Sequence, residues 1–147
     1  LHLFPKKTFI EAQFFWVGKA YLLFKLYDEG HVEFMDVVHA VQDVNKNSRF
    51  QETRCHYYIL KAQLYVARGL FGQAKKYIRK KKILAHEADN DWVLYESDKI
   101  LMIVHFKENE VESALKVYSA LKLMLTERTW KGCLEVIESL VSKYKKI

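Results

Sequence analysis

The segment YILKAQLYVARGLFGQAKKYI, residues 58–78, determines the fold of this chain. Its apolar and small residues return at helical spacing on both sides of Gly69, which predicts two helices joined by a short turn. The residues that carry the pattern are Tyr58, Ala62, Tyr65, Gly69, Ala74 and Ile78. Because Ala62 and Ala74 are small, we expect the two helices to pack closely where these residues meet.

The composition around this segment is that of one folded domain. The chain has 147 residues, of which 50% are hydrophobic, so we treat residues 1–147 as a single domain with its own core. One proline and five glycines argue against a many-stranded β fold. The longest apolar stretches are much shorter than the roughly 18 residues of a membrane helix, which predicts no contact with a membrane. Because the chain starts without Met, we expect it to be a fragment of a larger protein.

Helical periodicity appears in seven segments, and no segment shows sustained strand alternation. The expected helices cover residues 8–27, 32–44, 48–69, 71–86, 91–106, 109–125 and 130–144. Capping-box patterns place Thr8, Ser48 and Asn109 at helix starts, and Thr126 or Thr129 would cap the last helix. Short loops between helices predict antiparallel neighbours.

The spacing of the central segment returns elsewhere in the chain. Phe14-x-x-Val17-Gly18-x-x-Tyr21 and Trp130-x-x-Cys133-Leu134-x-x-Ile137 repeat its aromatic, apolar and small positions. With these residues the chain resembles the tetratricopeptide repeat family, whose unit begins W-x2-L-G-x2-Y. The repeats start at positions 14, 58, 98 and 130, which is a longer and less regular period than that family's 34 residues. HEAT-like repeats, other α–α repeats and a plain helical bundle are the alternatives.

The resemblance implies an all-α fold: a right-handed α–α superhelix of antiparallel helix pairs, with about seven helices. In such an array the first helix of each pair lines a concave surface that binds a partner peptide or helix. The family's positions place these residues in the groove: Phe15, Lys19, Leu22, His56, Ile59, Gln63, Lys99, Ile103, Phe106 and Lys131. The set is apolar with basic positions, which favours an acidic and apolar partner segment. Further repeats of the parent chain would be additional partners.

The positions of the family's clamp for chaperone tails hold Phe15, Lys19, Leu60, Glu96 and Ile100. Only one of these residues is basic, so we do not expect binding of a chaperone's C-terminal carboxylate.

The net charge of +6 arises from one segment. Six basic residues and no acid lie within residues 71–86. A basic patch of Lys75, Lys76, Arg79, Lys80 and Lys82 could contact phosphates, so weak binding of nucleic acid by helix 71–86 is the alternative function. The simpler interpretation is the solvated outer face of a structural helix.

Enzymatic motifs are missing from the sequence. We find no glycine-rich phosphate loop, no nucleophile elbow and no metalloprotease helix, and we predict no catalytic residue, cofactor or metal. Two cysteines without a disulfide framework favour an intracellular protein, cytoplasmic or nuclear. The leading hypothesis is therefore a non-enzymatic scaffold or adaptor segment. A bacterial peptide-sensing regulator is a third class, which would need an attached effector domain.

Overall fold

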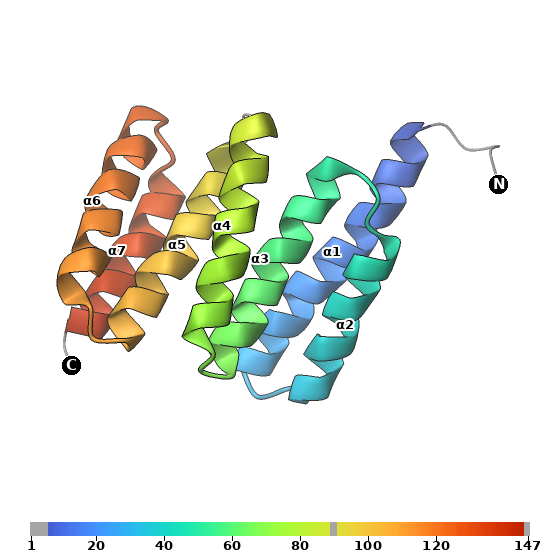
Figure 1. Ribbon diagram of the computed structural model, residues 1–147, viewed down its shortest axis with the longest axis horizontal. Coiled ribbons are helices and arrows are strands. Elements are labelled where there is room, and N and C mark those ends of the chain that lie inside the picture. The colour runs from blue at the N-terminus through green and yellow to red at the C-terminus, as the bar shows by residue number, and fades with distance from the viewer. Residues whose placement is uncertain (1–5, 89–90, 146–147) are drawn as a thin grey trace.

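The computed structural model describes residues 6–88 and 91–145, with the side chains of residues 11–50, 53–80 and 91–145. Within these residues the fold is entirely helical, which confirms the all-α prediction. The helices are α1 (Lys6–Asp28), α2 (Phe34–Asn47), α3 (Gln51–Ala67), α4 (Phe71–Ala88), α5 (Asp91–Lys107), α6 (Val111–Glu127) and α7 (Lys131–Lys145). Figure 1 shows them side by side, with α1 and α2 at one end of the array and α6 and α7 at the other.

The helices form two layers. Consecutive helices pack on each other along the whole chain, and the pairs α1–α2, α3–α4 and α5–α6 have the most extensive contacts. The odd-numbered helices also contact one another: α1 touches α3, α3 touches α5, and α5 touches α7. In the described part of the chain, the even-numbered helices make no such contacts among themselves. The odd helices therefore form a continuous inner layer.

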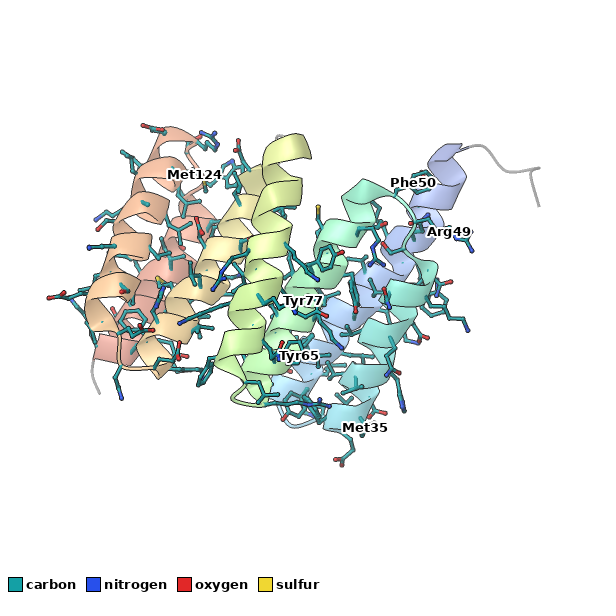
Figure 2. The ribbon with its side chains drawn as sticks, in the orientation of Figure 1. Met35, Arg49, Phe50, Tyr65, Tyr77 and Met124 are labelled. Atoms are coloured by element: carbon teal, nitrogen blue, oxygen red, sulfur yellow. The ribbon has the colours of Figure 1, made fainter. Side chains whose placement is uncertain are left out.

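The core consists of three main clusters that follow the chain. Each cluster joins a helix pair to the odd-numbered helix that follows it. The central cluster includes Ile59, Ala62, Ala74, Ile78, Ile100 and Val104. Ala62 and Ala74 are fully buried there, so the small residues lie between α3 and α4 as the sequence indicates. Tyr65 and Tyr77, drawn in Figure 2, close the same contact with ring centroids 5.5 Å apart.

Four helices end in the same hydrogen-bonded turn. After α3, Gly69 has a φ of 75°, its N–H donates to the carbonyl of Val66, and the N–H of Leu70 donates to the carbonyl of Tyr65. This is a Schellman motif, in which a left-handed residue lets the last carbonyls find donors. Gly30, Asn109 and Thr129 occupy the same place after α1, α5 and α6, with φ values of 82°, 61° and 59°.

Several predicted helix caps are wrong, two of them because of these turns. Asn109 and Thr129 end the preceding helix, and the residues Glu110 and Trp130 then lead directly into α6 and α7. Thr8 lies inside α1, which begins at Lys6. The break expected at residues 88–91 includes residues 89 and 90, which are outside the described part of the chain.

The turn that leads into α3 is held by a distant side chain, and Ser48 does not cap the helix. The Gln13 amide oxygen on α1 accepts hydrogen bonds from the Arg49 N–H at 2.7 Å and from the Thr53 hydroxyl at 2.8 Å. Ser48 instead ends α2 and donates its hydroxyl proton to Thr53 at 2.7 Å. Figure 2 shows Arg49 and Phe50 at this turn. The N–H of Arg49, in the turn before α3, is therefore satisfied by a residue 36 positions away in the sequence.

Candidate functional site

Four helices of the inner layer line a groove of about 370 Å³ near the C-terminal ends of α1, α3, α5 and α7. We call it the basic groove. Its apolar walls come from all four helices and consist of Phe24, Val66, Ile100, Ile103 and Leu140, with Tyr27 and Tyr144 beside them. A ligand in this position would contact four segments that are far apart in the sequence.

Three lysines line the basic groove, against one acid. Lys107 and Lys143 are exposed, Lys99 is half-buried, and Asp28 is the only carboxylate among the lining residues. Lys107 and Lys143 lie in the last turns of α5 and α7, where cations interact favourably with the partial negative charge of the helix C-terminus. Their full positive charges exceed those partial charges, so the groove attracts anions.

One buried polar atom of the basic groove has no partner. The Oε1 atom of Gln63 on α3 is buried, and no hydrogen-bond donor reaches it from the described residues. An unsatisfied buried acceptor costs about 1–3 kcal/mol.

A second depression lies on the same inner layer, toward the N-terminal ends of the helices. We call it the aromatic pocket. It has a volume of about 330 Å³ and is lined by Phe14, Val17, Gly18, Tyr21, His56, Trp92 and Glu96. The ion pair between Glu96 and Lys99, with atoms 3.3 Å apart, lies between the aromatic pocket and the basic groove.

The structure brings part of the predicted groove together. Gln63, Lys99 and Ile103 all line the basic groove, and His56 lines the aromatic pocket. These four residues come from α3 and α5, the two helices at the centre of the inner layer. Four of the predicted positions on the central helices therefore line one of the two depressions.

Other residues predicted for the groove lie elsewhere. Ile59 is fully buried in the central cluster, because its face of α3 packs against α4 and α5. Phe106 is 7% exposed and stacks on Tyr144 of α7 at 5.3 Å, so it belongs to the core. Both assignments to an accessible groove are therefore wrong.

The remaining predicted residues are exposed but line neither depression. Phe15, Lys19 and Leu22 form a stripe on α1, and Lys131 lies at the start of α7. Lys19 Nζ lies 5.6 Å from the centroid of the Trp16 ring. The structure gives these four residues no common site.

Sequence reasoning missed Lys143, Leu140 and Phe24. Leu140 stands on the amphipathic stripe of the last helix, and such stripes usually indicate core packing. The available signal was the position of Lys143 in the final turn of an odd helix, which matches that of Lys107. The groove forms where the C-terminal ends of these helices meet. The repeat positions reach it on α3 and α5 but include none of its residues on α1 or α7.

The basic patch on α4 is partly neutralised. Lys75 Nζ lies 2.6 Å from a carboxylate oxygen of Glu108 and 3.3 Å from one of Glu110. These hydrogen bonds raise the pKa of Lys75. Lys76, Arg79 and Lys80 are exposed, and Lys80 Nζ lies 5.2 Å from the Tyr77 ring centroid. The side chain of Lys82 is outside the described residues.

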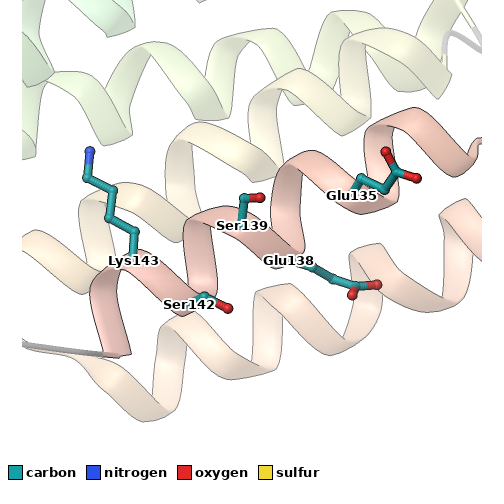
Figure 3. A pocket seen from close by; sticks show the side chains of 5 residues that line it. All are labelled: Glu135, Glu138, Ser139, Ser142 and Lys143. Carbon is teal, nitrogen blue, oxygen red and sulfur yellow. The ribbon is translucent and has the colours of Figure 1, made fainter.

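A third depression runs along the outer face of α7. Figure 3 shows the five side chains that line it, Glu135, Glu138, Ser139, Ser142 and Lys143, all from this one helix. No second helix contributes a wall, and the side chains project in different directions. This surface is a solvated helix face rather than a binding site.

Comparisons with protein-family models, curated proteins and solved structures found no match to this chain. Within the described residues, no helix is both long enough and apolar enough to span a bilayer. The same part of the chain contains no group of three or more His, Cys, Asp or Glu residues placed to hold a metal ion.

Proposed function

We propose that the chain is a non-enzymatic protein-interaction module, a scaffold or adaptor segment that binds a partner protein on its inner helix layer. The basic groove is the binding site in this proposal. The observation that carries it is the convergence of four helices on an apolar groove edged by Lys99, Lys107 and Lys143. The partner segment, extended or helical, combines apolar residues with at least one acidic residue.

Two features support a tetratricopeptide-like repeat array as the scaffold. The odd helices contact one another whereas the described even helices do not, and this asymmetry curves a helical array toward its odd layer. Gly30, Gly69 and Asn109 form the same turn at spacings of 39 and 40 residues, one for each helix pair. A right-handed superhelix whose odd helices line the concave side accounts for both.

The chemistry of the basic groove selects the partner's composition. Burial of apolar side chains against Val66, Ile103 and Leu140 supplies the attraction, at about 25 cal/mol per Å² of apolar surface. Acidic side chains would pair with Lys107 and Lys143, and a basic segment would be repelled. We also propose an intracellular protein, because Cys55 and Cys133, the two cysteines of the chain, do not form a disulfide with each other.

The test is a binding screen of short peptides in which acidic and apolar residues are varied independently. We expect peptides with both residue types to bind, and peptides with lysine in place of the acid to bind far more weakly. The double charge reversal Lys107→Glu with Lys143→Glu should weaken acidic peptides about tenfold, since exposed charge pairs contribute up to about 1 kcal/mol each. Fluorescence anisotropy of a labelled peptide would measure the change.

The matched control is the double reversal Lys116→Glu with Lys122→Glu, which changes the net charge equally. Both lysines are exposed on α6, outside the inner layer. We expect this variant to bind acidic peptides almost as the parent does at physiological salt. Equal losses in both double variants would show that net charge alone drives binding, and the groove assignment would then be wrong.

A further inference from the structure

The aromatic pocket has a different chemistry from the basic groove. Three aromatic side chains and the imidazole of His56 line it, and Glu96 is the only acidic residue in its lining. Phe14 and Trp92 are 39% and 44% exposed, so solvent reaches the rings at the rim. The side chain of Glu96 is only 9% exposed. The pocket thus combines accessible rings with a carboxylate set behind them.

The walls of the pocket are held in place by contacts within the protein. Tyr21 Oη lies 3.1 Å from His56 Nδ1, and the hydroxyl donates when the imidazole proton is on Nε2. The His56 ring lies edge-on to both Phe14 and Tyr21, with centroids 5.8 Å apart in each case. Trp92 packs against Tyr95 at 5.2 Å. A ligand would therefore meet a largely preformed site.

Glu96 keeps capacity for a second cation. Both oxygens of its carboxylate lie 3.3 Å from Lys99 Nζ, on the side of the basic groove. A carboxylate has about four acceptor positions, and one ammonium group does not use all of them. Burial, and in second place the charge of Glu96, raise the pKa of Tyr21 well above its usual value, which is consistent with a carboxylate close to the Tyr21 wall.

We propose that the aromatic pocket binds a cationic side chain of a partner peptide, either arginine or methylated lysine. The rings of Phe14, Tyr21 and Trp92 would surround the apolar rim of the cation, and Glu96 would be its counter-ion. A neutral apolar group would give the buried carboxylate no additional partner, and an anion would be repelled. The proposal goes beyond the basic groove and does not depend on it.

The chain suits a direct test by nuclear magnetic resonance, because it contains only three tryptophans. The indole N–H signals would be followed while a short trimethyllysine peptide is added, with Trp92→Phe assigning the signal of the pocket. We expect the Trp92 signal to shift and that of Trp16, which is absent from the pocket lining, to stay in place. The comparison ligand is the same peptide with a neutral tert-butyl group in place of trimethylammonium. The cationic peptide should bind about 5- to 30-fold more tightly, as expected for a cation among aromatic rings.

Glu96→Gln should remove most of this preference while leaving the shape of the pocket unchanged. Glu138→Gln, on the exposed face of α7, is the matched control and should retain it. Backbone amide spectra of both variants would show that they are folded. Equal binding of the charged and neutral peptides, or an undiminished preference in Glu96→Gln, would overturn the proposal. Free choline binding as tightly as the peptides would overturn the assignment to a peptide side chain.

Discussion

The pairs α3–α4 and α5–α6 are built alike but present different surfaces. Ala74 and Ala114 are both fully buried in the second helix of their pair, 40 residues apart. Gly69 and Asn109 occupy the same left-handed position of the turn, also 40 residues apart. Outside these positions the two pairs have little in common: α4 carries the basic patch, whereas the turn before α6 carries Glu108 and Glu110.

The comparison shows which residues the packing of a helix pair requires. Close approach of two helices needs a small residue at the contact, and a tight Schellman turn needs a residue that tolerates a positive φ. Both requirements recur with the structural period. The surface residues have no such requirement and differ freely, so the basic groove and the aromatic pocket each occur once in the described inner layer.

The largest loss of stability should come from replacing a buried alanine at a helix–helix contact with a larger residue. Ala62→Arg or Ala74→Arg inserts a long charged side chain between α3 and α4, where both alanines are fully buried. We expect a loss of several kcal/mol from overpacking and charge burial, against a typical stability of about 5–15 kcal/mol. Thermal melts would measure the loss, and Lys76→Arg on the exposed face of α4 should melt like the parent.

Ala114→Arg extends this prediction to the second pair. Because Ala114 is also fully buried, its replacement should cost about as much as that of Ala74. Each cluster shares helices with the next, so either substitution should lower the protection of amides along the whole array in hydrogen exchange. A loss confined to the mutated pair would contradict the cooperative array.

Substitutions at the left-handed turn position should change the stability by a smaller amount, and differently in the two helix pairs. No atom lies within 4 Å of a Cβ added at Gly69, so Gly69→Ala changes only the backbone energy at a φ of 75°. We expect a loss of about 1–2 kcal/mol, the cost of the left-handed region for a residue with a side chain. Asn109→Gly should be neutral or slightly stabilising, because asparagine already bears part of that cost. Equal losses in both variants would show that the two turns are not equivalent.

Much of the fold could be predicted because it depends on local patterns. The Tyr58–Ile78 spacing identified one helix pair, its turn at Gly69 and the contact of Ala62 with α4. The caps failed where the deciding partner is remote: Gln13 on α1 satisfies the backbone at the start of α3, and no local pattern encodes that contact. Asn109 failed because the same residue type serves as an N-cap and as a left-handed C-terminal residue.

The candidate site was predictable only near the centre of the array. Gln63, Lys99 and Ile103 lie on α3 and α5, each of which packs against odd helices on both sides, and helical periodicity places these residues on the inward face. Ile59 has the same periodicity, but its side of α3 is covered by α4 and α5. Periodicity gives the face of a helix, whereas the accessible part of that face depends on how the helices are set in space.

The basic patch offers a test of the difference in surface between the two pairs. Because Lys75 is paired with Glu108 and Glu110, we expect nucleic-acid binding by α4 to be weak, nonspecific and strongly dependent on salt. Lys76→Glu with Arg79→Glu should abolish whatever binding a filter assay detects, whereas Lys131→Glu should barely change it. Tight, sequence-specific binding at physiological salt would contradict this expectation.

The smallest change in stability is expected at the ion pairs between α4 and the turn before α6. The hydrogen bond from His105, and then that from Lys75, lower the pKa of Glu110 from its usual 4.5. A carboxylate whose pKa is lower in the folded state stabilises the protein above its unfolded pKa and loses that contribution as the pH falls through its folded pKa. The pKa of Lys75 is raised, so its contribution is present at neutral pH and is lost only as the pH rises through that higher value.

Glu110→Gln should therefore lower the melting temperature slightly at neutral pH and match the parent in acid, below the folded pKa of Glu110. Glu138→Gln, in the middle of α7 and away from this turn, should melt like the parent at neutral pH, because no described residue forms an ion pair with Glu138. If Glu110→Gln were as stable as the parent at neutral pH, the ion pairs between α4 and the turn before α6 would make no measurable contribution to the array.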